Sequence, residues 1–397
     1  MSSDILVNFS SLFLVMGAFQ GVLFSLLLIF RKHQRRSINF HLSVMLLALS
    51  IEILHVFMVK SGYINNLKSL AGFALPFDGI IAISLYWYVR TITFPEKNNS
   101  IKTVLFHYIP FFLYILLSIP FWRLPFSQKF EFLSSGVLSS EWPAPVYYAL
   151  MLQSVLKIIF FLIYLTLSIK LLSNHKKRIG EVFSYKENIT LNWLSNLLWL
   201  FLIGAAQGMI TLVFFQENPE SIQVAGSLEI FTILAILYIG IMGLLQPKVY
   251  KQSEKSYLKS IASIKSKHQS AKEKYRKSAL SNDDMKRISE KIEHIMKNES
   301  LFLNSALTLP KLADNLGISP HYLSQTFNTI FNVTFFDYIN AYRIDYAKKQ
   351  LNKKSNLNRS ITEIAADSAF NSRSAFYSAF KKNVGMTPTQ YKEIAKQ

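Results

Sequence analysis

Seven apolar stretches, each long enough to cross a lipid bilayer, occupy most of the first 245 residues of the chain. A helix needs roughly 20 mainly apolar residues to cross the hydrocarbon core, where its backbone polar groups must be satisfied within the segment. The stretches lie near residues 9–30, 38–59, 70–94, 103–122, 146–169, 193–215 and 224–245. The sequence therefore predicts a bundle of seven transmembrane helices over residues 1–245. The first stretch is expected to remain as a span, because no basic residue precedes it as in a cleavable signal peptide.

Basic side chains are unevenly distributed over the short loops between these stretches. The loops after stretches 1, 3 and 5, counted together with Arg90 at the end of stretch 3, hold 12 Lys or Arg, whereas the loops after stretches 2, 4 and 6 hold 4. Because Lys and Arg are retained on the cytoplasmic side, the N-terminus is predicted outside and the C-terminus in the cytoplasm. An odd number of spans agrees with this orientation.

A few ionisable side chains interrupt the apolar stretches. They are Glu52, His55, Asp78, His107, Lys157 and Glu229. Such groups are costly in hydrocarbon, so they either line a binding site or join neighbouring helices by hydrogen bonds. Among them we select Glu52 and Lys157 as candidate ligand-binding residues. An acid inside the bundle would neutralise Lys157, but the sequence does not show which acid meets it.

The absence of several motifs argues against an intramembrane enzyme. The chain contains no cysteine, which excludes disulfides, cysteine nucleophiles and cysteine-ligated metals. It also contains no G-x-S-x-G, H-E-x-x-H or phosphate-binding loop. We therefore expect no catalytic residue, no metal site and no cofactor.

The C-terminal part of the chain is strongly basic. The net charge is +19, and Lys and Arg outnumber Asp and Glu by 14 to 7 in residues 246–300 and by 12 to 6 in residues 301–397. This excess suggests anionic lipid or nucleic acid as a partner. Residues 246–300 are predicted to be a basic juxtamembrane linker, in contact with headgroups or simply solvated, followed by a helix that Ser281 or Asn282 caps.

Two segments near the C-terminus repeat one pattern of a short helix, a tight turn and a second helix. They read "LADNLGISPHYLSQTF" at 312–327 and "IAADSAFNSRSAFYSAF" at 364–380, and "FFDYINAYRIDYAKKQL" joins them as one long helix. Gly317 can take the positive φ of the first turn, and Ser319 can cap the helix that follows. Asn371 or Ser372 can cap the second helix of the other copy. The pattern predicts two tandem helix-turn-helix motifs.

Each second helix has one apolar and one polar face. Leu323, Phe327, Ile330 and Phe331 fall on the side predicted to be buried in the first motif, as do Ala375, Phe376, Ala379 and Phe380 in the second. The outward positions carry small and polar side chains, which allow close approach to base edges and phosphates. These candidate DNA-binding residues are His321, Ser324, Gln325 and Asn328 in the first motif, and Arg373, Ser374, Tyr377, Ser378 and Lys381 in the second.

Residues 301–397 resemble the DNA-binding domain of the AraC family of bacterial transcription regulators. The similarity lies in both motifs, in the helix between them and in the closing "FKKNVGMTPTQY". It implies that the two recognition helices enter successive major-groove segments, about one helical turn apart. This chain departs from the family pattern at Ala369, where the family usually has Gly, and Ala there suggests either a negative φ or some strain.

Together these features predict an all-α protein with three parts. These are a seven-transmembrane sensor domain (1–245), the basic linker and helix (246–300) and an AraC-type DNA-binding domain (301–397) in the cytoplasm. The leading hypothesis is a one-component transcription regulator that is a multi-pass protein of the inner membrane of a bacterium. The implied partners are double-stranded DNA, RNA polymerase, the bilayer, a small-molecule or membrane signal, and a second copy of the chain. The alternative is a transporter whose DNA-binding tail regulates its own operon, which would require inverted repeats or broken helices.

Overall fold

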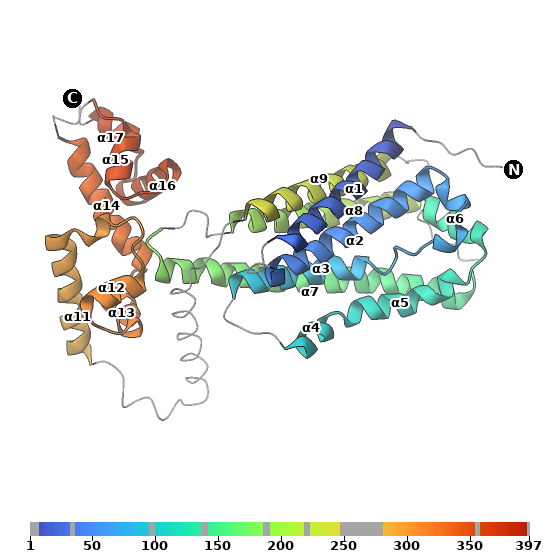
Figure 1. Ribbon diagram of the computed structural model, residues 1–397, viewed down its shortest axis with the longest axis horizontal. Coiled ribbons are helices and arrows are strands. Elements are labelled where there is room, and N and C mark those ends of the chain that lie inside the picture. Colours follow the sequence, from blue (N-terminus) through green and yellow to red (C-terminus); the bar gives the residue numbers. More distant parts are fainter. Residues whose placement is uncertain are drawn as a thin grey trace. The chain divides into compact units, whose positions relative to one another are not determined.

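The computed structural model describes residues 8–31, 36–94, 100–135, 142–185, 191–217, 223–246, 281–353 and 358–394 (Figure 1). The regular elements of these residues are helices, with one isolated antiparallel β-bridge between Phe183 and Thr308 and no strand within the described ranges. The chain divides into two compact units. The first comprises Met1–Leu172 and Leu191–Gln246, and the second comprises Ser173–Thr190 and Pro247–Gln397.

The first unit is a bundle of long helices. They are α1 (Phe9–Phe30), α2 (Arg36–Lys60), α3 (Asp78–Thr93), α4 (Ile101–His107), α5 (Ile109–Trp122), α6 (Phe126–Ser135), α7 (Ala144–Val182), α8 (Asn192–Glu217) and α9 (Gln223–Leu245). Short 3-10 turns at Tyr63–Asn65 and Lys68–Leu70 follow α2. α7 is a single helix of 39 residues, and its end from Ser173 belongs to the second unit.

Four helices of the described residues are long and apolar enough to cross a membrane. They are α1, the Ile38–Lys60 part of α2, α7, and the Leu228–Leu245 part of α9. A fifth span results if α4 and α5, which meet at a 40° bend, form one broken span. The all-helical prediction is therefore confirmed for the described residues, whereas the number of seven spans is not confirmed.

The predicted span 70–94 differs from the observed structure at its start. Gly72 has a φ of 82°, in the left-handed region, and Pro76 follows it, so the helix begins only at Asp78. A left-handed glycine and a proline each interrupt helical hydrogen bonding. The remaining helix α3 has 16 residues, about 24 Å of length at 1.5 Å per residue. That is shorter than the hydrocarbon core of roughly 30 Å.

Close contacts between small residues hold α1 against α2. The Ser25 and Ser43 hydroxyls each donate a hydrogen bond of 3.1 Å to the other residue's carbonyl oxygen. Asn39 donates from Nδ2 to the Leu28 carbonyl at 3.0 Å. A Cβ at Gly21 would lie 2.1 Å from the Ser50 hydroxyl oxygen, so only glycine allows this approach. Small residues and interhelical hydrogen bonds of this kind are typical of membrane bundles.

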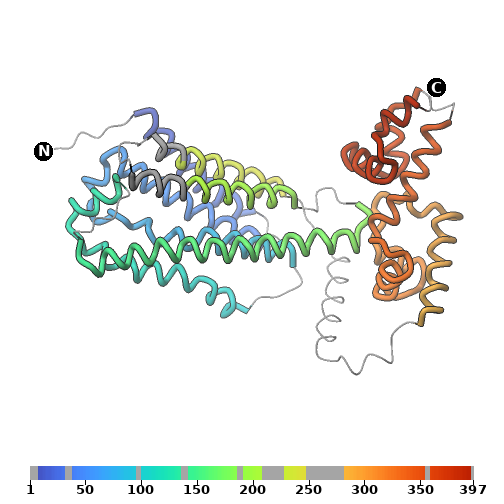
Figure 2. Tube along the Cα trace, turned by 180° about the vertical axis from the view of Figure 1, so that it is seen from behind, coloured from blue at the N-terminus to red at the C-terminus, as the bar shows by residue number. Residues whose placement is uncertain are grey.

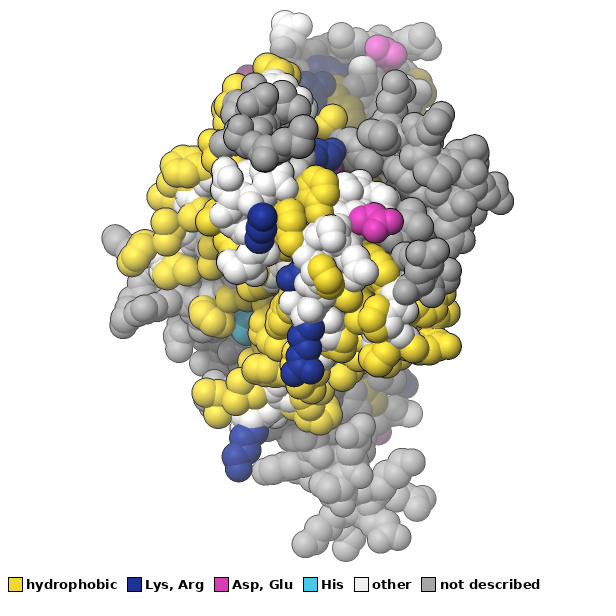
Figure 3. All heavy atoms as spheres, turned by 90° about the vertical axis from the view of Figure 1, so that its right-hand side faces the viewer, with side chains coloured by type: hydrophobic (Ala, Val, Ile, Leu, Met, Phe, Trp, Pro, Cys, Tyr) yellow, Lys and Arg dark blue, Asp and Glu magenta, His cyan; other side chains and the backbone are white. Residues whose placement is uncertain are grey.

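The surface of the first unit carries many large apolar side chains. Phe9 is 87% exposed, Phe30 82% and Phe19 69%. Figure 3 shows hydrophobic side chains over most of the described surface at the α6 end of the bundle, with a few basic ones among them. Contiguous apolar surface of this extent marks contact with lipid or another protein. The helices of the N-terminal part are therefore suited to a membrane.

The second unit consists of shorter helices together with the end of α7. They are α11 (Asn282–His294), α12 (Leu309–Leu316), α13 (Pro320–Thr326), α14 (Phe335–Leu351), α15 (Ile361–Asp367), α16 (Arg373–Val384) and α17 (Pro388–Ile394). π-helical turns at Ile295–Glu299 and Phe327–Phe331 and a 3-10 turn at Leu301–Leu303 complete the unit. Ser281 caps α11, as predicted. Most of the predicted linker, residues 247–280, lies outside the described residues.

α14 matches the predicted joining helix and lies between the two motifs (Figure 2). At its C-terminal end it packs against the second motif in a cluster of buried residues. The cluster comprises Ile344, Ala347, Leu351, Ile364, Ala365, Phe376, Ala379 and Phe380. At its other end Phe335 and Ile339 are buried, and the Phe335 ring meets Phe327 of the first motif at 5.5 Å. One continuous helix thus serves as core for both motifs.

Candidate nucleic-acid interface

The first helix-turn-helix motif is formed by α12 and α13. Gly317 closes α12 with a φ of 65°, in the left-handed region, and its N–H donates to the Asp314 carbonyl at 3.2 Å. Ser319 then caps α13, because its side chain accepts a hydrogen bond from the Tyr322 N–H at 3.3 Å. The predicted turn chemistry is confirmed at both positions.

Replacing Gly317 with Ala should destabilise the first motif by about 1–2 kcal/mol, the cost of placing an L-residue in the left-handed region. No heavy atom lies within 4 Å of the added Cβ, so backbone strain is the whole effect. Hydrogen exchange of the α12 and α13 amides measures it. Gly180→Ala is the matched control, since a Cβ there meets Thr334 only at 3.9 Å and no positive φ is involved. Equal exchange rates in the two variants would contradict the strain argument.

The second motif is formed by α15 and α16. Ser360 and Glu363 form a capping box at the start of α15, and Ser372 caps α16 by accepting from the Ala375 N–H at 3.2 Å. Ala369 lies between the two helices with a φ of 62°. The alternative of a negative φ at this position is therefore wrong, and a strained alanine takes the left-handed conformation that glycine would adopt more easily.

The candidate DNA-binding residues of the first motif lie on the face of α13 away from the core. His321 and Asn328 are exposed, whereas Ser324 and Gln325 are half-buried. On the opposite face Leu323 is fully buried. The predicted division of the helix into two faces is thus confirmed over α13.

One residue of the predicted buried face does not follow the pattern. Ile330 is 37% exposed. The helix widens into a π turn over Phe327–Phe331, and the i→i+5 hydrogen bonding of such a turn changes the angle between successive side chains. Ile330 therefore turns outward while Phe327 remains buried.

The second motif presents a more basic face. Arg373, Ser374, Ser378 and Lys381 are exposed on α16, and Tyr377 is half-buried. The core side of the helix holds Phe376, Ala379 and Phe380, which are all buried. The structure thus places all five candidate residues on the side of α16 that is open to a ligand.

Tyr377 positions the Arg373 guanidinium. Arg373 donates from Nη2 to the Tyr377 hydroxyl at 3.1 Å, and its Cζ lies 5.1 Å from the centre of the ring. The Tyr377 hydroxyl is also 2.9 Å from the Thr389 hydroxyl. These hydrogen bonds, first that of Thr389 and then that of Arg373, lower the pKa of Tyr377. The Arg373 guanidinium is thereby held in place at the start of α16.

Arg343 lies at the centre of the unit, and we did not single it out from the sequence. Its side chain is 1% exposed and donates from Nε to the Phe302 carbonyl at 2.8 Å and from Nη2 to the Asn304 carbonyl at 2.8 Å. Its Cζ also lies 5.9 Å from the Phe370 ring, in the turn of the second motif. One guanidinium therefore contacts the segment before the first motif and the turn of the second. In the sequence, its role is indicated only by the position of a charged residue on the helix that joins the two motifs.

Comparison with known proteins agrees with this geometry. A family profile described as "Helix-turn-helix domain" matches residues 312–394. The C-terminal region is an AraC-type helix-turn-helix domain.

Several curated regulators share this domain. The melibiose operon regulatory protein of Escherichia coli is 35% identical over 94 residues, which are 24% of this chain and 30% of that protein. The bifunctional transcriptional activator/DNA repair enzyme AdaA of Bacillus subtilis is 34% identical over 104 residues, 26% of this chain and 46% of that protein. This chain therefore spans less than half the length of these relatives. A solved structure of a protein of unknown function from Listeria innocua matches 27% of this chain and 95% of its own, with 32% identity and a TM-score of 0.24.

In the first unit, the structure brings the two candidate ligand-binding residues together through Asp78. Lys157 Nζ lies 2.5 Å from Asp78 Oδ2. Glu52 interacts electrostatically with both Asp78 and Lys157, and its Oε1 is a buried atom with no hydrogen-bond partner among the described residues. The Lys157 side chain is 55% exposed, so the group is open at the surface of the bundle. Two carboxylates and one ammonium thus lie together, with the ammonium exposed and the Glu52 Oε1 buried.

The other ionisable residues of the stretches have structural partners. His55 Nε2 accepts a hydrogen bond from the Gly72 N–H at 3.1 Å, and His107 Nδ1 is 3.0 Å from the Tyr164 hydroxyl. Lys60 and Glu229 form an ion pair at 2.6 Å. These contacts join helices and leave the Glu52 group as the candidate binding site.

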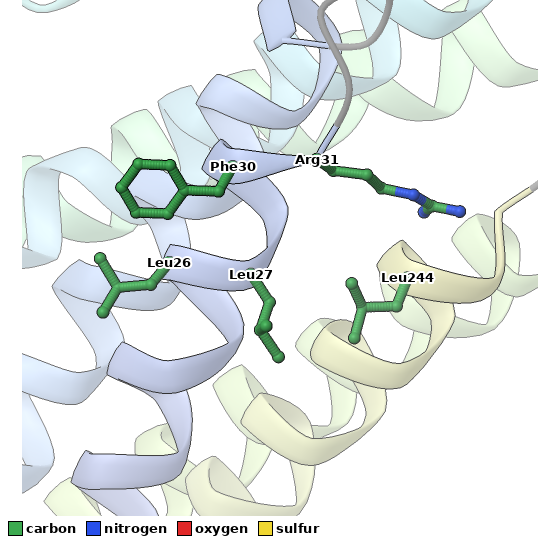
Figure 4. Close-up of a pocket in the computed structure, with 5 residues that line it drawn as sticks. All are labelled: Leu26, Leu27, Phe30, Arg31 and Leu244. Carbon is green, nitrogen blue, oxygen red and sulfur yellow. The ribbon is translucent and has the colours of Figure 1, made fainter.

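A shallow pocket at the ends of α1 and α9 is of a different kind. Figure 4 shows its lining residues, Leu26, Leu27, Phe30, Arg31 and Leu244. All but Arg31 are apolar, and Arg31 donates a hydrogen bond to the Gly243 carbonyl at 3.3 Å. No polar groups converge among its lining residues, so its chemistry is that of the apolar surface around it.

Proposed function

We propose that this protein is a membrane-embedded one-component transcription regulator. The observation that carries the proposal is the presence of a paired helix-turn-helix domain in one chain with helices apolar enough to cross a bilayer. In the proposed arrangement, seven spans in the inner membrane of a bacterium hold the domain on the cytoplasmic side. The signal binds the membrane part in two states of the protein with different affinities. It therefore shifts the balance between these states and so changes the DNA affinity.

The proposed DNA contacts divide into base-reading and phosphate-binding residues. His321, Ser324, Gln325 and Asn328 on the first motif, with Arg373, Ser374, Tyr377 and Ser378 on the second, face base edges in the two major-groove segments. Lys381 lies more than two turns after Arg373 and meets the backbone, which sets register without reading sequence. We further propose that Glu52 and Lys157 bind the signal, and that neither unit is an enzyme.

Binding to duplex DNA should depend strongly on salt, because Lys and Arg contacts release counterions from phosphates. The test uses the full chain in lipid nanodiscs with a duplex enriched from a randomised pool, between about 50 and 200 mM salt. Lys381→Ala should weaken all sequences about equally and reduce the salt slope by roughly one unit. Lys349→Ala, an exposed lysine on α14 outside both recognition helices, is the control. An affinity that does not change with salt would sink the proposal.

The proposed topology has its own test. Reporter fusions after Gln216 and after Gln246 should report the outside and the cytoplasm respectively, because the 12-to-4 distribution of Lys and Arg over the loops retains the basic loops inside. Localisation of both fusions to one side of the membrane would show that the chain does not cross between them.

The bend between α4 and α5 favours the transporter hypothesis, since broken helices occur at transporter binding sites. A transporter that also regulates its operon would accumulate a substrate in vesicles, whereas a sensor would bind its signal without accumulating it. Uptake measurements on compounds that alter DNA binding therefore separate the two functions.

A further inference from the structure

The end of helix α7 is part of the DNA-binding unit. Residues Ser173–Thr190 are grouped with the C-terminal half of the chain. On this end of the helix His175, Ile179 and Val182 are buried, at 0%, 0% and 1% exposure, and Phe183 directly after the helix is also 0% exposed. Their spacing places them on one helical face. The end of this long helix thus packs into the unit that carries both motifs.

Backbone pairing fixes this docked segment beside the first motif. Phe183 and Thr308 form an antiparallel β-bridge. Ser184 donates to the Leu307 carbonyl twice, from its N–H at 3.3 Å and from its hydroxyl at 2.7 Å. Thr308 is the residue before the first helix of that motif. Any displacement of Ser184 therefore acts directly on the start of α12.

Arg343 binds the same segment from α14. Its Nη1 donates to the Ser184 carbonyl at 2.8 Å, and its Nη2 donates to the Ser184 hydroxyl at 3.1 Å. The other donors of this guanidinium bind Phe302 and Asn304, and the ring of Phe370 lies against it. The planar fork of arginine suits such simultaneous contacts. Ser184 is thus tied to the group that contacts both halves of the DNA-binding domain.

We propose that the end of α7, with Phe183 and Ser184, is the element through which the membrane part controls the DNA-binding domain. This inference rests on the proposed function. The same helix carries Lys157 of the charged group, 25 residues before Val182, about 38 Å along one continuous helix at 1.5 Å per residue. A shift or rotation of α7 moves Ser184 on Arg343 and changes the relative orientation of the two motifs. Tight binding needs both recognition helices in their grooves at once, so a change of orientation changes the affinity.

A disulfide provides the first test, because the chain has no cysteine of its own. A Cβ placed on Gly180 lies 4.0 Å from the Thr334 Cβ, within the range of about 3.5–4.5 Å that disulfides require. In membranes that contain the full chain, Gly180→Cys with Thr334→Cys should form an intramolecular disulfide on mild oxidation, detected in linked peptides by mass spectrometry. The two single variants are the controls, and Thr334→Cys alone also reports the loss of the cap on α14.

The second test measures DNA affinity in the full chain. Ser184→Ala removes a hydroxyl that accepts from Arg343 and donates to Leu307, and Ser173→Ala, exposed near the end of α7, is its matched control. Ser184→Ala should change the affinity for an enriched duplex about fivefold or more, the lower end of ordinary coupling between sites, while Ser173→Ala stays within about twofold. Circular dichroism verifies that both variants are folded, and the disulfide test does not depend on either.

The outcomes separate the two proposals. A disulfide in one chain together with an altered affinity in Ser184→Ala supports the control element. Absence of the disulfide, or equal affinities in the two serine variants, overturns it. If the disulfide forms but the unsubstituted chain binds no duplex at any salt concentration, the proposed function fails, and the regulatory role of α7 fails with it.

Discussion

Replacement of Arg343 by Met should destabilise the DNA-binding unit by about 2–6 kcal/mol, because two buried carbonyl oxygens, those of Ser184 and Phe302, lose their donor at about 1–3 kcal/mol each. The guanidinium also donates to the Asn304 carbonyl, which keeps the Leu307 N–H as a second donor at 3.1 Å. Methionine fills a similar volume but donates to none of them. Arg343→Lys should restore the stability only in part, since one ammonium cannot reproduce the planar fork.

Hydrogen exchange is the suitable measurement for this variant. All five tryptophans lie between Trp87 and Trp199, so tryptophan fluorescence does not report on the C-terminal unit. Amides of α12 and α14 should exchange about a hundredfold faster in Arg343→Met, as local opening becomes easier by about 3 kcal/mol. Lys349→Met, exposed on the same helix, is the matched control. Protection equal to that of the control would show that Arg343 does not hold the unit together.

Replacement of Gln325 by Ala should relax the sequence preference at one or two base pairs and cost about 1–3 kcal/mol against the preferred duplex. A glutamine on the outward face of a recognition helix can pair with adenine N6 and N7. Gln325 is half-buried on α13, opposite the buried Leu323, so it can project toward DNA without disturbing the core. Competition among randomised duplexes, with the full chain in nanodiscs, measures both effects.

Lys381→Ala is the contrasting variant in that experiment. It removes an exposed ammonium from α16 and should lower the affinity for every sequence by a similar factor, because phosphate contacts carry no sequence information. The assignment of helix faces is wrong if Gln325→Ala leaves the preferred sequence unchanged while Lys381→Ala alters it.

Much of the local structure of the second unit follows from the sequence. Ser319 and Ser372 cap their helices, and Gly317 takes the positive φ that its place after α12 suggested. α14 spans Phe335–Leu351, the joining helix predicted from its pattern. These features depend on interactions within three or four residues, so a short stretch of sequence contains all the groups that make them.

The sequence also limits the kind of function, since the paired motif and the apolar stretches can be recognised without coordinates. Which outward residues bind DNA remains a prediction, as does the number of spans. The sequence leaves the conformation of Ala369 open, because alanine prefers a negative φ but replaces a family glycine. The packing of the chain around it decides for a strained positive φ of 62° over a different turn.

The tertiary structure alone decided which distant residues meet. Lys157 pairs with Asp78 across 79 positions of sequence, and Arg343 binds Ser184 across 159. Helical periodicity shows which side of a helix is apolar, but it does not show which other helix covers that side. Ser184 is an ordinary polar residue in the sequence, in the loop between the predicted spans 146–169 and 193–215. It became a candidate control point only when folding placed its carbonyl and hydroxyl against a buried guanidinium, since the cost of burying that charge is offset only where several acceptors converge.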